Sequence, residues 1–105
     1  MPAISFSVFK EKVKDGRKRQ TIRAVKKRVI KPKDTLYLYW HQRRKDCELL
    51  RTEQCTTVWK MPYEDFCRSE TIAKADGFEN SEELRKWFEK VQKPFPYDEF
   101  FIIRW

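Results

Sequence analysis

The chain has 105 residues, of which 38% are charged and 40% hydrophobic, and its formal net charge is +8. This length fits one domain, residues 1–105, and leaves no room for a second hydrophobic core. No apolar run approaches the length of a membrane span, and the N-terminus lacks the apolar region of a signal peptide. We therefore expect a cytoplasmic monomer that makes no contact with a membrane.

The predicted elements alternate between strands and short helices. Alternation and β-branched or aromatic content predict strands at residues 3–6, 20–24, 35–40, 49–60 and 100–105. Apolar residues at helical spacing predict helices at residues 8–15, from 62 towards 76, and 81–91, with Gly16 and Gly77 as helix ends. The last strand is hydrophobic on both faces and so belongs in the interior of a sheet. The sequence therefore predicts a β-rich α+β fold with two or three short helices, built as a small mixed or antiparallel barrel.

Residues 16–23 read Gly-Arg-Lys-Arg-Gln-Thr-Ile-Arg and hold a cluster of polar side chains at fixed spacing. Alternate side chains of a strand share a face, so an extended run from Arg19 puts Arg19, Thr21 and Arg23 on one side. Lys18 reaches the same place from the preceding turn. Two or three cations and a hydroxyl in one pocket mouth suit a phosphate or a polarised carbonyl.

Positive charge is concentrated around this segment. Residues 10–33 hold twelve Lys and Arg and two acidic residues, a balance of +10, so the rest of the chain sums to −2. Such a cluster is typical of a nucleic-acid partner, and a solvated surface is the alternative. Trp40, at a strand end, either stacks on an exposed base or caps the barrel. The expected RNA-binding residues are Arg17, Lys18, Arg19, Arg23, Lys26, Lys27, Arg28, Trp40, Arg43 and Arg44.

Cysteine and histidine usage argues against several kinds of site. Cys47, Cys55 and Cys67 are odd in number and have no CxxC spacing, which disfavours a disulfide framework and a structural zinc site. His41 is the single histidine, so histidine-based triads and metal clusters are not expected. We therefore expect no metal and no cofactor.

The spacing Gly-x-Lys-x-x-Thr-x-Arg, after an expected strand and short helix, resembles the signature of the ASCH family (activating signal cointegrator homology domains). A second stretch, residues 73–78 followed by 81–88, resembles the acidic-Gly-Phe turn and helix that family members often have. With the hydrophobic last strand, the resemblance covers nearly the whole chain. ASCH domains are small barrels similar to PUA RNA-binding domains, so the resemblance implies a single PUA-like mixed β-barrel that binds RNA.

The resemblance also implies an enzymatic alternative. Small bacterial members that deacetylate acetylated cytidine are described as using a Lys, a Thr and a Glu, and this chain offers Lys18, Thr21 and Asp76. The aspartate departs from the family pattern by one methylene. In such a reaction Thr21 attacks the amide carbonyl, and Lys18, with its pKa lowered by desolvation or neighbouring cations, takes the proton. Asp76 then orients the lysine or the substrate amine.

Three functions therefore remain open from the sequence. We expect first a module that binds RNA or a modified nucleoside, because the concentrated charge favours a polymer. The alternatives are an amidohydrolase acting on acetylated cytidine in the same cleft, and a basic accessory domain that docks on an acidic protein. RNA binding places Lys18, Thr21 and Arg23 in the cleft. Whatever the cleft does, we also expect Lys18, Thr21 and Asp76 to meet there. Asp76, at the negative end of a helix dipole, then needs Lys18 as its cationic partner.

Overall fold

Six strands form two three-stranded sheets in the computed structural model, which describes residues 3–24, 30–91, 95 and 97–105. No pairing between the described strands closes the two sheets into a barrel, so the closed barrel predicted from the sequence is not observed. The predicted β-rich α+β class is confirmed. The strands are β1 (Ala3–Phe6), β2 (Gln20–Ala24), β3 (Thr35–Trp40), β4 (Glu48–Gln54), β5 (Thr57–Pro62) and β6 (Glu99–Arg104).

The first sheet has the order β1-β3-β4 and the second the order β2-β6-β5. β1 pairs with β3 in parallel, while the other pairs are antiparallel. β6 lies in the centre of its sheet, between β2 and β5, as the sequence predicts. The reason is its apolar run, because residues 100–103 are all buried and so contact protein on both faces of the sheet.

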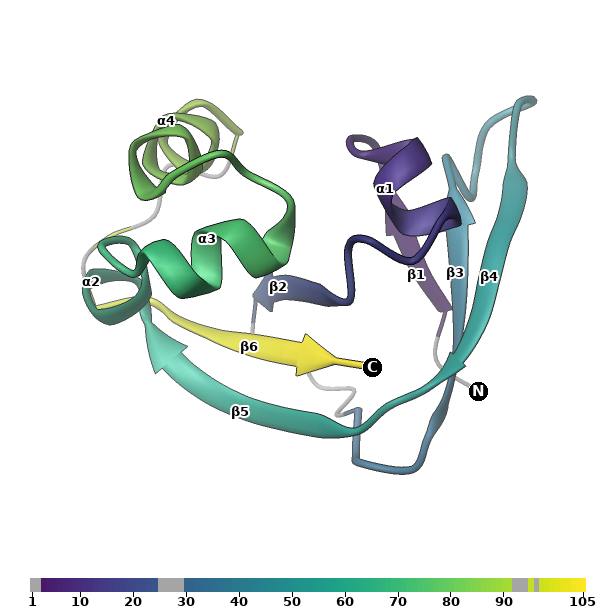
Figure 1. Cartoon of the computed structure of the whole chain (residues 1–105), viewed down its shortest axis with the longest axis horizontal. Helices are drawn as coiled ribbons and strands as arrows, with labels where there is room; N and C mark the ends of the chain where they lie inside the picture. The colour runs from purple at the N-terminus through teal and green to yellow at the C-terminus, as the bar shows by residue number, and fades with distance from the viewer. Residues whose placement is uncertain (1–2, 25–29, 92–94, 96) are drawn as a thin grey trace.

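The predicted strand at residues 49–60 is two strands that belong to different sheets. The break falls at Cys55, whose amide donates to Asp34 O at 2.8 Å and whose carbonyl accepts from Lys33 N at 2.8 Å. Figure 1 shows β4 and β5 following each other along one curved path, so this part of the chain links the two sheets.

Four helices occur in the described residues, where the sequence predicts two or three: α1 (Lys10–Lys14), α2 (Tyr63–Phe66), α3 (Glu70–Asp76) and α4 (Ser81–Val91). The helix expected at 8–15 starts later because Phe9 has a φ of 61°, in the left-handed region. The helix expected from 62 to 76 is interrupted, and Ser69 caps α3 by accepting from Ile72 N at 3.2 Å. The predicted bounds of α4 are confirmed. No helix in the described part of the chain is long and apolar enough to span a membrane.

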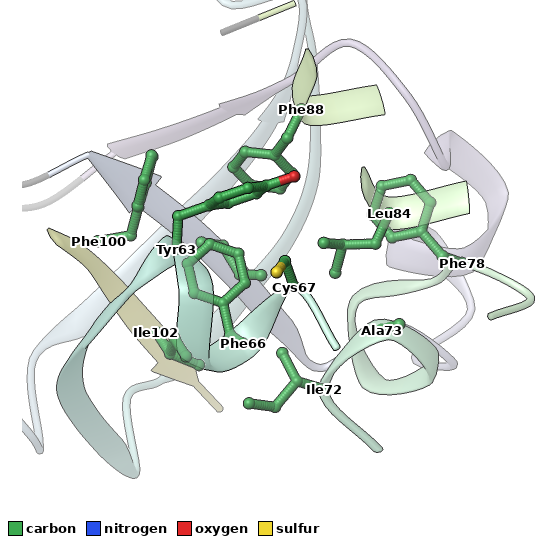
Figure 2. Packing of buried hydrophobic residues seen from close by; sticks show 11 residues of the cluster. Tyr63, Phe66, Cys67, Ile72, Ala73, Phe78, Leu84, Phe88, Phe100 and Ile102 are labelled. Atoms are coloured by element: carbon green, nitrogen blue, oxygen red, sulfur yellow. The ribbon is translucent and has the colours of Figure 1, made fainter. Parts of the chain in front are cut away.

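One hydrophobic core lies between the second sheet and helices α2, α3 and α4, which gather on one side of that sheet in Figure 1. Figure 2 shows the aromatic centre of this core, where the rings of Tyr63, Phe66, Phe88 and Phe100 lie close together. The ring centroids of Phe66 and Phe88 are 5.5 Å apart, in an edge-on arrangement that aromatic pairs favour. This packing fixes α3 and α4 over β2 and β6.

A second core lies on the opposite face of β6. Successive side chains of a strand point to opposite faces, so Phe100 and Ile102 enter the first core while Phe101 and Ile103 enter the second. There they join Leu36 and other buried residues of β1 and β3. The two cores together hold the two sheets and the helices around one central strand.

Candidate functional site

A small pocket lies where β1, the start of β2, the end of α3 and helix α4 meet. Its volume is about 60 Å³. In Figure 1, α3 and α4 lie on one side of this region and β1 and α1 on the other. The pocket is lined by Ser5, Phe6, Ser7, Val8, Lys18, Thr21, Ile22, Arg23, Asp76, Phe78, Trp87 and Phe88. All three residues of the expected triad, together with Arg23, therefore line one pocket.

Lys18 and Asp76 form a buried ion pair in the wall of this pocket. Lys18 Nζ lies 3.2 Å from Asp76 Oδ2, and the two residues are 2% and 7% exposed. The aspartate therefore reaches the lysine despite being one methylene shorter than a glutamate. Lys18 also donates to the backbone carbonyl of Asp76, so one ammonium serves both the side chain and the helix end.

Two lysines stabilise the C-terminal end of α3, where the last helical carbonyls lack partners within the helix. Lys18 takes the carbonyl of Asp76, and Lys12 Nζ donates to Gly77 O at 2.6 Å. Gly77 ends the helix with a φ of 109°, as the sequence predicts for a glycine at this position. Positive charge at this end offsets the unfavourable helix dipole near the Asp76 carboxylate.

Burial shifts the proton affinities of both partners. It lowers the pKa of Lys18, because desolvation of the ammonium outweighs its attraction to Asp76, and Arg23 and Lys12 lower that pKa further. It raises the pKa of Asp76, against the opposing effects of Lys18, Gln20 and Arg23. Both shifts weaken the usual preference of each group for its charged form within the ion pair, so these groups are suited to exchange protons with a ligand.

The second carboxylate oxygen of Asp76 has no partner among the described residues. Oδ2 is paired with Lys18, whereas the buried Oδ1 has no donor at hydrogen-bonding distance and angle in the described part of the chain. The Gln20 amide, which helps to lower the pKa of Asp76, is directed to the carbonyl of Ile72 at 3.1 Å. Leaving a buried charged oxygen unpaired costs free energy, and buried polar groups in proteins are nearly always satisfied. An orphaned acceptor in the lining of a pocket is therefore suited to a donor from a bound molecule.

Thr21 and Arg23, which line the same pocket, are held together by a hydrogen bond. Arg23 Nε donates to Thr21 Oγ1 at 3.0 Å, and Arg23 Nη2 donates to Ser5 O at 2.7 Å. The guanidinium also lies over the Phe6 ring, 5.1 Å from its centroid. Arg23 thus fixes the threonine oxygen as an acceptor, which leaves the hydroxyl proton of Thr21 available for a different partner.

Two of the expected basic residues lie away from the pocket. Arg19 does not share a face with Thr21, because the strand begins at Gln20 and the exposed Arg19 side chain donates to Trp105 O at 3.0 Å. Arg17 is also exposed, and its Nε lies 2.7 Å from Asp15 Oδ2. Arg19 therefore does not join Thr21 and Arg23 in the pocket lining, where the sequence predicts it, and a role of Arg17 and Arg19 in RNA binding stays a prediction. Lys26, Lys27 and Arg28 lie outside the described residues.

Trp40 makes protein contacts on its ring rather than presenting it openly. The His41 ring stacks on it with centroids 4.1 Å apart, and Lys10 Nζ lies 5.7 Å from its centroid. It packs, half-buried, against the second core. These contacts favour a packing role for Trp40, and its stacking on an exposed base stays a prediction. Arg43 and Arg44 are exposed and line a neighbouring pocket with His41.

Several lining residues were not identified from the sequence as part of a site. Ser5 and Ser7 gave no signal, because their place in the lining depends on a contact distant in sequence, in which Arg23 Nη2 donates to Ser5 O. Trp87 has the helical spacing of a core residue and does pack against the first core, but it also lines the pocket beside Phe78, with ring centroids 6.1 Å apart. Gln20 was read only as a strand residue, yet its side chain is buried and donates to Ile72 O at 3.1 Å.

The donor set of the described residues does not suit a metal ion. In residues 3–24, 30–91, 95 and 97–105, no group of three or more His, Cys, Asp and Glu side chains gathers in a way that could hold one. Cys55 and Cys67 are buried and Cys47 is exposed, all three as free thiols.

Comparison with protein-family models, with curated proteins and with solved structures finds no match for this chain.

Proposed function

We propose that this protein binds RNA and that the pocket of Lys18 and Asp76 receives the edge of one nucleoside, for which acetylated cytidine is the best candidate. The observation that carries the proposal is the buried Asp76 Oδ1, which accepts no hydrogen bond from the described residues although Asp76 lines the pocket. Such an acceptor is suited to a ligand N–H group.

The polar groups of the pocket complement an acylated amino group. An acetylated exocyclic amine has one N–H donor and one carbonyl acceptor. Asp76 Oδ1 is available for the N–H, and the Lys18 ammonium and the Arg23 guanidinium are donors in the same lining. The aromatic side chains Phe78 and Trp87 supply apolar surface for a methyl group or a base edge.

The pocket volume limits what can enter. A cavity of roughly 150 Å³ is needed to enclose benzene, and a single water needs roughly 10–15 Å³. At about 60 Å³ this pocket accommodates a substituent of a base rather than the whole ring. An acetyl group is of suitable size. In this proposal the pocket therefore recognises the acetyl group, and the base lies outside it at the pocket entrance.

The proposal includes a fold of the PUA-like kind, as the resemblance to ASCH domains implies. Two features support it. The first is the mixed pairing, in which β1 runs parallel to β3 within an otherwise antiparallel set. The second is the curved path of β4 and β5, which passes from one sheet to the other around the central β6 (Figure 1).

RNA binding is tested with a short fluorescein-labelled single strand that carries one acetylated cytidine and with the same strand carrying cytidine. Fluorescence anisotropy should show that the wild-type protein prefers the acetylated strand by about tenfold, since a hydrogen bond to a charged group is worth about 1.5–3 kcal/mol. Asp76→Asn should abolish the preference. Lys18 holds the amide oxygen of the new asparagine, so its NH₂ group faces the ligand N–H.

The matched control is Glu82→Gln, which removes an exposed carboxylate of α4 outside the pocket lining and should keep the preference. Equal affinity of the wild-type protein for both strands contradicts the proposal. So does a preference that survives in Asp76→Asn, provided that circular dichroism shows a folded variant.

An amidohydrolase acting on acetylated cytidine is the second candidate function. It is favoured by one observation, the joint presence in the pocket of the oriented Thr21 hydroxyl and of Lys18, whose pKa burial lowers. In this reaction Thr21 Oγ1 attacks the acetyl carbonyl carbon while its proton passes to the neutral Lys18 amine. The C–N bond then breaks as Lys18 returns the proton to the departing cytidine amine, and water hydrolyses the acetyl-threonine ester to acetate.

Turnover is tested by incubating the pure protein with acetylated cytidine and following the release of cytidine by chromatography. An enzyme should release cytidine, and Lys18→Ala and Thr21→Val should abolish the release. Asp76→Glu should raise it by restoring the longer carboxylate of the enzymes that this chain resembles. If wild-type protein binds the acetylated strand and releases no cytidine, binding alone is the function.

A further inference from the structure

A second pocket adjoins the nucleoside pocket and shares one wall with it. It is lined by residues 5–7 and 41–44, and its volume is about 290 Å³. Residues 5–7 line both pockets. A molecule with one group in the first pocket therefore has its neighbouring group at the second.

The loop that forms the far wall is tied to β1. Gln42 N donates to Ser5 Oγ at 3.1 Å, and His41 N donates to Phe6 O at 3.1 Å. Within the loop, His41 Nδ1 lies 2.8 Å from an oxygen of Asp46. These contacts hold the loop against the shared wall, so the second pocket is preformed.

The lining of the second pocket is positively charged and contains no carboxylate. Arg43 and Arg44 contribute two exposed guanidinium groups, and neither takes part in any ion pair found in the described part of the chain. The acidic residue of the same loop, Asp46, is already bonded to His41. Hydroxyl and amide donors of Ser7 and Gln42 complete the lining. Guanidinium groups that are free of ion pairs can donate paired hydrogen bonds to the oxygens of a phosphate, and neighbouring hydroxyl groups can donate further ones.

We propose that this second pocket binds the phosphate group of the nucleotide whose base edge enters the first pocket. The proposal rests on the proposed function and specifies its ligand class as phosphorylated nucleotides and their polymers rather than free nucleosides. It also gives Arg43 and Arg44 a defined role, as the residues that recognise the phosphate next to the modified base.

The test compares three ligands by calorimetry: acetylated cytidine, its 5′-monophosphate and inorganic phosphate. The monophosphate should bind about tenfold or more tightly than the nucleoside, since a charge-assisted hydrogen bond contributes at least that factor. In the double variant Arg43→Gln/Arg44→Gln the monophosphate should bind as weakly as the nucleoside, and the affinity for the nucleoside should stay unchanged. The matched control, Arg68→Gln/Lys90→Gln, removes the same charge from exposed positions outside both linings and should keep the tenfold difference.

Inorganic phosphate gives a readout that does not depend on the nucleoside pocket. In NMR spectra it should shift the backbone amide signals of residues 41–44 in the wild-type protein and leave them unshifted in the double variant. Equal binding of nucleoside and monophosphate overturns the phosphate site and leaves the proposed function in place. Shifts at 41–44 without any nucleoside binding support the phosphate site and contradict the proposed function. If the control variant also loses the tenfold difference in affinity between monophosphate and nucleoside, net charge alone is responsible, and this result overturns the phosphate site.

Discussion

Replacing Lys18 by methionine removes the cation of the buried ion pair and keeps a long side chain in the pocket wall. Lys18 and Asp76 are 2% and 7% exposed, so the substitution leaves a carboxylate that is buried and uncompensated. Removing one partner of such a pair costs about 3–5 kcal/mol of folding free energy. Each kcal/mol shifts the melting temperature of a domain of this size by about 4–8 °C, so the loss is about 12 °C or more.

The loss in Lys18→Met should depend on pH. Burial already raises the pKa of Asp76 above its ordinary value of 3.8, and removing Lys18, which lowers it, raises it further. A carboxyl group whose folded pKa is raised contributes stability that is fully present below its unfolded pKa and is lost as the pH rises through its folded pKa. The penalty of Lys18→Met is therefore smaller at about pH 4 than at about pH 8.

Urea unfolding followed by tryptophan fluorescence measures this penalty at both pH values. The matched control is Lys86→Met, which breaks the exposed pair of Lys86 with Glu82 at 3.3 Å and should cost less than about 1 kcal/mol. In the double variant Lys18→Met/Asp76→Asn the loss should be smaller than the sum of the two single losses, because no buried charge remains. A Lys18→Met penalty as small as that of the control, or one that does not change with pH, refutes the description of a buried ion pair.

Three further substitutions test the helices around the pocket, each by urea unfolding. Phe88→Ala removes a ring that is 1% exposed from the aromatic core and should cost about 3–5 kcal/mol; a loss below 1 kcal/mol contradicts the packing. Gly77→Ala places a side chain at a φ of 109° and 3.1 Å from the Phe9 ring, so a cost of about 1–3 kcal/mol is expected, and an unchanged stability rules out this helix end. Ser69→Ala removes the cap of α3 and should cost about 1 kcal/mol, whereas Ser69→Asp should retain most of the stability.

Elements with strong local signals could be predicted from the sequence. The bounds of α4 follow from its apolar face and its capping residues, and Asn80 Oδ1 accepts from Glu83 N at 2.9 Å as a cap does. The central place of β6 follows from its continuous apolar run. Local patterns do not show where a run of β-forming residues passes from one sheet to another, since the break at Cys55 depends on hydrogen bonds to Lys33 and Asp34.

The candidate site could be predicted in part, for a similar reason. Lys18 and Asp76 are 58 positions apart, and their pairing was expected because a family resemblance linked two distant motifs and because a carboxylate at a helix end needs a cation. Arg19 was misplaced because it precedes β2, whose bounds agree with the predicted 20–24, so the alternation of strand side chains does not extend to it. Trp87 carries the helical spacing of a core residue, and its sequence position gives no sign that it borders a pocket.

The most direct test of the account is whether a ligand reaches the unpartnered oxygen of Asp76. The carboxyl carbon of Asp76 is followed by ¹³C NMR while acetylated cytidine 5′-monophosphate is added to the labelled protein, with cytidine 5′-monophosphate as the matched ligand. We expect a saturable shift of the Asp76 carboxyl signal with the acetylated nucleotide, together with shifts of the Lys18 and Thr21 amides. An Asp76 signal that stays unchanged at saturation, or that both nucleotides shift equally, contradicts ligand binding at this oxygen.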